Sequence, residues 1–271
     1  MTFCFRKGVG LGGSGVLIYG RHPVREALLR GDVVERIWLQ DDLAHRTRED
    51  IERLARARGV PVLHVPRQKL DELLRREAPD IPRIRHQGVA ARIVLHEGPS
   101  LAELVAWVTR TRTAKGSETP LLLALDHWED PQNVGAAIRT AVAVGAGGVL
   151  LPERRSAGVT PAVVKASAGA AHILPPTRVP NLVRALKTLQ EAGAWVIGAV
   201  MDGGKDYRRA DYTSPTVLVV GSEGRGLSRL VLETCDERVE IPMRGGVGSL
   251  NASVAAALLL YEAYRQRFPL A

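Results

Sequence analysis

Three short polar segments hold the side chains of this sequence that are best suited to chemistry. They are "DPQNVGAAIRTA", with Asn133 and Arg139, "VVGSEGRGLS", with Glu223, and "PMRGGVGSLN", which leads through Ser249 to Asn251. Glycines crowd the second and third segments, and glycine lets a ligand approach the main chain closely. Main-chain amides in such loops could cradle an anion, while the polar side chains could position a substrate.

Each of these side chains also has a purely structural interpretation. Asn133 could cap the helix expected to begin at Val134. Arg139 could be a surface charge, although its apolar neighbours favour a specific contact, and Glu223 could stand exposed in a tight strand-to-helix turn. The sequence lacks the G-x-S-x-G and G-x-x-x-x-G-K-[ST] patterns, which argues against a hydrolase nucleophile elbow and a P-loop NTPase. Its seven histidines form no metal-binding spacing, so we expect no metal.

The composition indicates which binding partners and which cellular compartment to expect. A net charge of +8 favours a polyanionic partner such as nucleic acid, although many basic surfaces bind nothing. No apolar run reaches the roughly 18 to 20 residues of a membrane helix. The two cysteines are far apart and no signal peptide is recognisable, so we expect a cytoplasmic protein without a membrane partner.

The segments between the polar loops predict two α/β units. Residues 1–15 are rich in glycine and are expected to form a flexible tail. Strands and helices alternate over residues 16–97, which predicts a small α/β domain, and residues 98–118 have the composition of a connector with one short helix. Over residues 119–271 the alternation restarts with strands such as "LVVG", apolar on both faces. These strands predict a parallel sheet covered by helices on both sides, with the polar loops at the carboxyl ends of its strands.

The last expected helix, "SVAAALLLYEAY", is apolar on almost every side. A helix of this kind is normally buried all round. The sequence therefore predicts a core element directly after Ser249 and Asn251.

Taken in chain order, the three polar segments resemble the motifs of the SpoU-type RNA 2′-O-ribose methyltransferases, the TrmH family of the SPOUT superfamily. The matching residues are Asn133-Val134-Gly135 with Arg139, then Gly221-Ser222-Glu223-Gly224, then Ile241-Pro242-Met243 through Ser249-Leu250-Asn251. The order of the three motifs, each after an expected strand, carries the resemblance over about residues 119–268. In the first half, "YGRHPVREALL" and "HQGVAARI" resemble the substrate-binding domain of the subgroup that methylates guanosine in large-subunit ribosomal RNA.

The resemblance implies a fold and a set of partners. The fold is an α/β SPOUT domain, a parallel sheet with a deep trefoil knot, preceded by a small α/β RNA-binding domain like a ribosomal protein. The implied methyl donor is S-adenosyl-L-methionine (SAM), and the implied substrate is ribosomal RNA. A homodimer is also implied, in which the C-terminal helix packs against both the knot and a second subunit.

The resemblance also implies roles for individual residues. Arg139 is expected to carry catalysis as a clamp on the target phosphate. Asn133 and Asn251 would position phosphate and ribose, Glu223 would orient neighbouring donors, and Ser249 would bond near the transferred group. The residues implied to hold SAM are Gly221, Ile241, Met243 and Leu250. Arg21 and His22 are candidates for RNA contact, with a surface turn before a helix as the alternative.

Three other functions stay open at this point. Within the same family, the enzyme could methylate an adenosine in ribosomal RNA and confer antibiotic resistance, or it could methylate tRNA. Outside enzymology, the chain could be a ribosome-assembly module that binds RNA without activity, although intact polar residues in all three segments oppose this.

Overall fold

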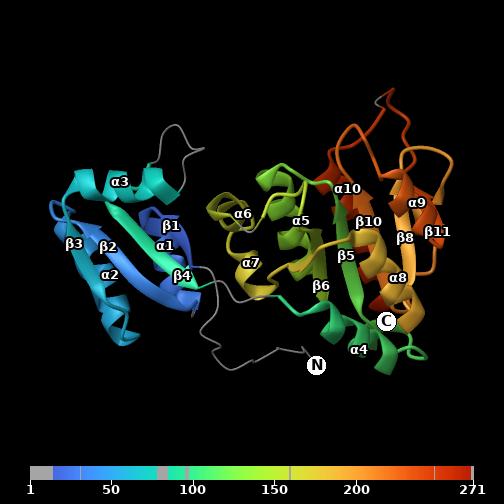
Figure 1. Cartoon of the computed structure of the whole chain (residues 1–271), viewed down its shortest axis with the longest axis horizontal. Coiled ribbons are helices and arrows are strands. Elements are labelled where there is room, and N and C mark those ends of the chain that lie inside the picture. The colour runs from blue at the N-terminus through green and yellow to red at the C-terminus, as the bar shows by residue number, and fades with distance from the viewer. Residues whose placement is uncertain are drawn as a thin grey trace. The chain divides into compact units, whose positions relative to one another are not determined.

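The computed structural model describes residues 15–30, 32–77, 85–94, 98–158, 160–246 and 248–269, which form two compact units (Figure 1). The smaller unit spans Cys4–His96 and the larger one includes Glu97–Ala271. The tail expected over residues 1–15 lies outside the described residues as far as residue 14, and Gly15 already begins the first strand.

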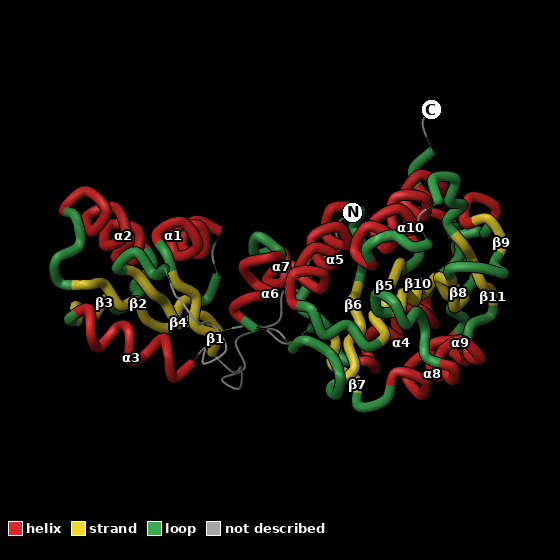
Figure 2. The backbone as a smooth tube through the Cα atoms, turned by 90° about the horizontal axis from the view of Figure 1, so that it is seen from above, coloured by secondary structure: helices red, strands yellow, loops and turns green. Residues whose placement is uncertain are grey.

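A mixed four-stranded sheet forms the smaller unit, in the order β1-β4-β2-β3. Its strands are β1 (Gly15–Tyr19), β2 (Val34–Gln40), β3 (Val62–Val65) and β4 (Val89–Val94). Figure 2 shows α1 (Arg21–Arg30) and α2 (His45–Ala57) over one face and α3 (Arg67–Glu77) over the other. Leu70 and Leu74 of α3 are fully buried, so this unit has a core of its own and confirms the expected small α/β fold.

Seven parallel strands form the sheet of the larger unit, in the order β7-β6-β5-β10-β8-β11-β9. They are β5 (Leu121–Asp126), β6 (Gly148–Pro152), β7 (Thr177–Val179), β8 (Trp195–Val200), β9 (Lys205–Asp206), β10 (Thr216–Gly221) and β11 (Glu237–Glu240). Every residue of β5 and β10 is buried, which is the pattern of central strands covered on both faces. The predicted parallel sheet is confirmed.

Helices cover both faces of this sheet in two layers (Figure 2). One layer consists of α4 (Leu101–Arg110), α8 (Leu182–Ala192) and α9 (Arg229–Thr234). The other consists of α5 (Pro131–Ala143), α6 (Pro161–Ala166), α7 (Ala170–Ile173) and α10 (Ala252–Arg267). The 3-10 turns η1 (Gly116–Glu118) and η2 (Tyr207–Arg209) precede β5 and β10 respectively.

The segment expected as a connector, residues 98–118, contains α4 and η1. Ser100 caps α4 through a capping box with Glu103. Leu104 and Val108 are spaced by one turn and are buried in the core under α8, so this helix packs as part of the larger unit.

Helix α10 is buried on one side only. Its inner side carries fully buried small and aliphatic residues, namely Ala256, Leu259, Leu260 and Ala263. Its outer side is also apolar, and Val254, Leu258, Tyr261, Tyr264 and Phe268 are each between 37% and 54% exposed. The expectation of a helix buried all round is therefore wrong for the single chain, because none of the described elements covers the outer side.

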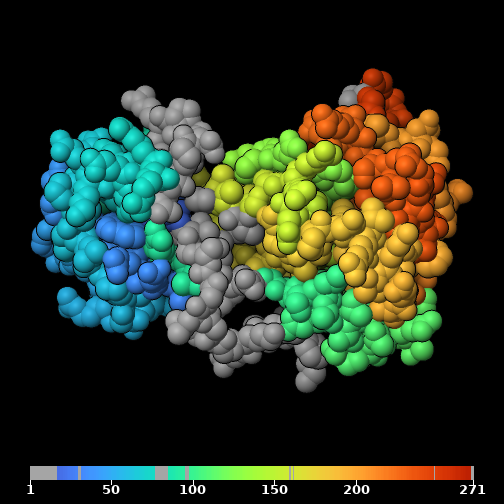
Figure 3. Space-filling view, in the orientation of Figure 1, coloured from blue at the N-terminus to red at the C-terminus, as the bar shows by residue number. Residues whose placement is uncertain are grey.

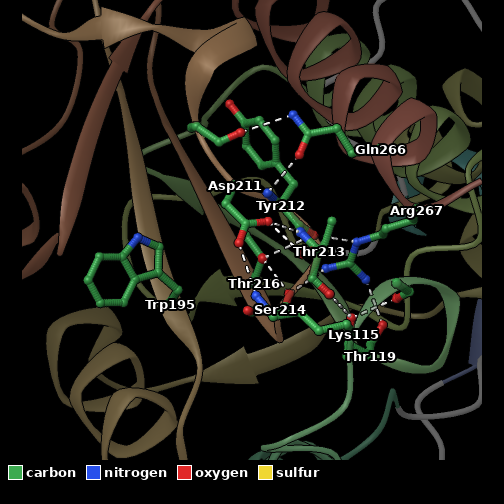
Figure 4. A network of polar contacts seen from close by, with 12 residues as sticks. Lys115, Thr119, Trp195, Asp211, Tyr212, Thr213, Ser214, Thr216, Gln266 and Arg267 are labelled. Atoms are coloured by element: carbon green, nitrogen blue, oxygen red, sulfur yellow. Dashed lines mark hydrogen bonds and ion pairs between the residues drawn. The ribbon is translucent and has the colours of Figure 1, made fainter. Parts of the chain in front are cut away.

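The end of α10 is anchored by the buried side chain of Arg267 (Figure 4). Its guanidinium donates to the carbonyl oxygens of Thr119 at 2.6 Å, Pro120 at 3.3 Å, Tyr212 at 2.8 Å and Ser214 at 2.8 Å. Burial lowers the pKa of Arg267 to about 10, against an opposing effect of Asp211, so the group stays charged at neutral pH. These bonds tie α10 to the segments that lead into β5 and β10.

Candidate active site

The three polar segments lie at the carboxyl edge of the parallel sheet. The first follows β5, the second follows β10, and the third follows β11 and leads into α10. β5 and β10 are direct neighbours, and β8 lies between β10 and β11. The third segment protrudes from the surface of this unit, as the red region at the upper right of Figure 3 shows. Ligands of parallel α/β sheets bind at this edge, so the arrangement favours a site there.

Asn251 joins the three segments through its side chain. Its Nδ2 donates to Asn133 Oδ1 at 3.0 Å and to Glu223 Oε2 at 3.2 Å. Its Oδ1 accepts the main-chain N–H of Ser253 at 2.9 Å, which makes Asn251 the N-cap of α10. One amide group therefore caps the helix and holds the other two segments together.

Asn133 lies within α5 and does not cap it. The N-cap is Asp130, whose carboxylate accepts the N–H of Gln132 at 2.9 Å, and Pro131 is the first helical residue. The helix start expected at Val134 is thus wrong and the alternative of a cap at Asn133 is excluded, because an aspartate followed by proline is a stronger start signal three residues earlier. The Asn133 amide is consequently available for the contact with Asn251.

Two other residues of the first motif are Gly135, which allows close helix packing, and Arg139, which carries a charge. A Cβ on Gly135 would lie 2.5 Å from Ala166 Cβ and 2.7 Å from the main-chain nitrogen of Ser167, so glycine is needed where α5 meets α6. Arg139 follows one helical turn later, beside the buried Ile138, and is exposed. Among the described residues its side chain makes no hydrogen bond or ion pair, either with the Asn251 cluster or elsewhere. Its guanidinium is free to meet a ligand.

A pocket of about 640 Å³, counting its open mouth, lies between the ends of β8, β10 and β11 and the start of α10. Six residues predicted for the site line it, namely Gly221, Glu223, Ile241, Met243, Ser249 and Leu250. Gly221 permits the turn that forms one wall, because a Cβ there would lie 2.0 Å from the carbonyl carbon of Gly226. Pockets with mostly apolar walls and a few polar groups are typical of sites for small organic ligands.

Trp128 fixes the loop after β5 and was not singled out from the sequence. Its side chain is 2% exposed, and its Nε1 donates to the carbonyl oxygens of Val220 and Gly221, both at 3.0 Å. The carbonyl of Trp128 accepts the N–H of Ala157 at 2.8 Å. The loops after β5 and β6 and the end of β10 are thus held in one arrangement. The sequence signal for this role is a large aromatic residue within an otherwise polar loop.

The residues expected to contact RNA lie in the smaller unit and are both exposed. Arg21 contacts Gln87, to which its main-chain N–H donates at Oε1 (3.2 Å) and its Nε donates at the carbonyl oxygen (3.4 Å). Gln87 has a φ of 52°, and the adjacent His86 is buried with its Nε2 3.1 Å from Asp71 Oδ1. For His22 no hydrogen bond or ion pair occurs with the described residues.

Two negative observations apply to the described part of the chain. None of its helices has the length and apolar character needed to cross a membrane. No three His, Cys, Asp or Glu side chains come together there as a metal site would require.

Comparison with known protein families shows where these motifs occur. The model of the SpoU rRNA Methylase family matches residues 120–261, which include all three polar segments. The chain belongs to this family. A second family model, described as RNA 2′-O ribose methyltransferase substrate binding, matches residues 17–99. As a SpoU family member the chain is an RNA methyltransferase, and the Asn251 cluster with the adjacent pocket is its candidate active site.

Relatives of known sequence align over nearly their whole length. YacO of Bacillus subtilis (strain 168), a protein assigned to the TrmH family of tRNA/rRNA methyltransferases, is 40% identical over 93% of this chain and 96% of its own. A protein of Staphylococcus haemolyticus with the same family assignment is 42% identical over the same shares of both chains.

Solved structures of the SpoU family are similar as well. An AdoMet-bound rRNA methyltransferase from Sinorhizobium meliloti matches with a TM-score of 0.71 and 27% identity over 95% of this chain and 88% of that one. The SpoU methyltransferase AviRb from Streptomyces viridochromogenes, in complex with the cofactor AdoMet, matches with a TM-score of 0.68 and 28% identity over 93% and 90%.

Proposed function

We propose that this enzyme methylates the ribose 2′-OH of a guanosine in large-subunit (23S) ribosomal RNA, with SAM as the methyl donor. The observation that carries the proposal is the meeting of three polar segments at Asn251, beside a pocket with mostly apolar walls. Family membership supports methyl transfer to RNA, and the match of the smaller unit to a ribose-methyltransferase substrate-binding domain supports the 2′-OH as acceptor. The relatives are named for both tRNA and rRNA, so tRNA is the second candidate substrate.

SAM is the cofactor that fits the pocket. Two similar SpoU family structures bind AdoMet. The pocket offers apolar walls at Ile241, Met243 and Leu250 for a flat ring, and main-chain groups next to Gly221 for polar edges. We assign the binding of the SAM adenine and ribose to these four residues.

The chain's own residues must align the acceptor, because SAM supplies a methyl group already activated on a sulfonium. Free arginine keeps its proton at any ordinary pH, so Arg139 acts as a clamp on the target phosphate and stabilises the developing alkoxide, while the 2′-OH proton passes to phosphate or water. Asn133 and Asn251 position phosphate and ribose, while Glu223 fixes the Asn251 amide by accepting a hydrogen bond from its Nδ2. Ser249 lines the pocket and bonds near the transferred group.

The smaller unit supplies RNA affinity in this proposal. Arg21 is held against the Gln87 turn and His22 is exposed beside it in sequence, so both are placed to meet a phosphate or a base. Cationic side chains of this kind bind phosphate with little dependence on sequence. The enzyme would act in the cytoplasm, where its RNA substrate is made and matured.

A second copy of the chain is the proposed protein partner. The exposed apolar side of α10, which carries Leu258, Tyr261, Tyr264 and Phe268, needs cover, and a helix face of this kind is suited to a self-complementary interface. The trefoil knot implied by the resemblance belongs to the same proposal.

The test is transfer of tritiated methyl from SAM to separated 23S rRNA and tRNA, followed by nuclease mapping of the 2′-O-methyl position. Arg139→Ala should lower transfer by at least about 100-fold, because it removes the charge that stabilises the transition state. SAM affinity should stay within about twofold. Arg184→Ala, an exposed arginine on the opposite helix layer, is the matched control.

Three other results would contradict parts of the proposed function. Normal turnover of the Arg139→Ala variant would remove this residue from the mechanism. A methyl group mapped to adenosine or to tRNA would replace the proposed target, and no transfer to any RNA by the wild-type enzyme would favour the assembly module.

A further inference from the structure

A second pocket shares part of its wall with the first. It is lined by His127, Arg155 and Arg225, which come from the loops after β5, β6 and β10 respectively. Ser222 and Gly226 line both pockets. One histidine and two arginines from three separate loops thus converge beside the candidate cofactor site.

His127 is held in place by a buried carboxylate. Its Nδ1 lies 2.9 Å from Asp126 Oδ1, and the Asp126 side chain is 3% exposed. The other oxygen of Asp126 accepts the N–H of Ser228 at 2.7 Å. Because Nδ1 donates its hydrogen to Asp126, Nε2 is the atom of His127 that remains for another partner.

Two of the three residues have an unusual backbone. His127 has a φ of 61° and Arg155 a φ of 55°, a left-handed conformation that few non-glycine residues adopt. Such conformations persist where the surroundings fix them, and they cluster at functional sites. The hydrogen bond from Ala157 N–H to the carbonyl of Trp128 joins the two loops and fixes both residues.

The two arginines of the pocket have no carboxylate partner among the described residues. Arg155 and Arg225 are exposed, and within the described residues neither side chain forms a hydrogen bond or an ion pair. No acidic residue is among those that line the pocket. Asp126 is engaged by His127 and by the N–H of Ser228, and Glu223 accepts a bond from Asn251. A concave surface of one charge attracts an anion.

We propose that this second pocket binds a phosphate of the RNA substrate next to the nucleotide that is methylated. The proposal rests on the proposed function, because it takes RNA as the substrate. Phosphate is the anion that RNA presents at every nucleotide, and the arginine fork matches its oxygens with two parallel hydrogen bonds. The shared wall at Ser222 and Gly226 places that phosphate beside the methyl donor. His127, Arg155 and Arg225 are therefore substrate-positioning residues distinct from Arg139.

The test compares Arg155→Gln and Arg225→Gln with Arg154→Gln in steady-state methyl transfer. Arg154 is the exposed arginine next to Arg155 and does not line the pocket. The control therefore removes one positive charge from the loop of Arg155 without changing the pocket. Each pocket variant should raise the KM for RNA about tenfold, as loss of a hydrogen bond to a charged group predicts, with kcat at saturating RNA within about twofold. The slope of log affinity against log salt should fall by about 0.7 for one lost phosphate contact. The control should match the wild type in all three.

His127 needs a variant that preserves its fold. His127→Asn tolerates the positive φ and keeps an amide donor for Asp126, but it lacks an equivalent of Nε2. Its melting temperature should match that of the wild type, while its KM for RNA should rise several-fold. An unchanged KM with a normal melting temperature would exclude His127 from the pocket's function.

The remaining outcomes separate this proposal from others. Equal effects of all three arginine variants would mean a general basic surface, and no effect of any would also overturn the pocket. A weaker SAM affinity of Arg155→Gln or Arg225→Gln in calorimetry would assign the pocket to the SAM carboxylate instead. Failure of the proposed function appears separately, as a wild-type enzyme that methylates no RNA.

Discussion

Asn251 caps α10 and also holds Asn133 and Glu223 by hydrogen bonds. Two substitutions of Asn251 separate these roles, because they remove different parts of the side chain. Asn251→Ala removes both the cap on α10 and the clamp on Asn133 and Glu223. Asn251→Ser keeps an N-cap oxygen, since serine caps about as well as asparagine. The shorter hydroxyl cannot reach the other two segments as the amide does. The serine variant therefore loses the clamp alone.

The expected free energies follow from these contacts. Loss of the cap should lower the free energy of unfolding by about 1 kcal/mol. The two clamp bonds are between exposed groups, so solvent screening keeps their joint contribution near about 1 kcal/mol. We expect a loss of about 2 kcal/mol for Asn251→Ala and about 1 kcal/mol for Asn251→Ser. Urea unfolding at one fixed protein concentration measures both.

Methyl transfer gives the second readout. Both variants let the segments of Asn133 and Glu223 move apart, and small misplacements of positioning groups can cost about 100-fold in rate. The two variants should therefore lose activity equally, although they differ in stability. Wild-type activity of Asn251→Ser would refute the clamp, and equal stability of the two variants would refute the cap as a separate contribution.

Two further predictions concern α10. Arg267→Met should lower the free energy of unfolding by about 3 kcal/mol in urea titration, because it leaves buried carbonyl oxygens without their donor. Arg267→Lys should recover only part of this free energy, since one ammonium group cannot reach all of these oxygens. An unchanged urea midpoint for Arg267→Met would contradict the role of Arg267 as an anchor. Tyr264→Lys on the exposed apolar side should convert a dimer into a monomer in analytical ultracentrifugation, whereas Leu230→Lys on the opposite helix layer should not. A wild-type enzyme that sediments as a monomer would contradict the dimer.

Local patterns predicted the central strands of this fold. Strands such as "LLLALD" and "TVLVVG" are apolar on both faces, and that property alone indicates burial in a parallel sheet. The start of α5 lies three residues before the predicted one, because Asp130 followed by Pro131 is a stronger start signal than Asn133. The outer side of α10 was misjudged, since an apolar residue reports that cover is needed and says nothing about which molecule provides it.

The sequence by itself determined the three motifs, the family they resemble and their place after strands, because these depend on residues close together in the chain. Only the tertiary structure decided that β10 inserts between β5 and β8, and this order brings the segments of Asn133, Glu223 and Asn251 within hydrogen-bonding distance. The roles of Trp128 and of the second pocket were decided in the same way. Their contacts join residues up to about a hundred positions apart, and such contacts depend on strand order and packing, which no local pattern encodes.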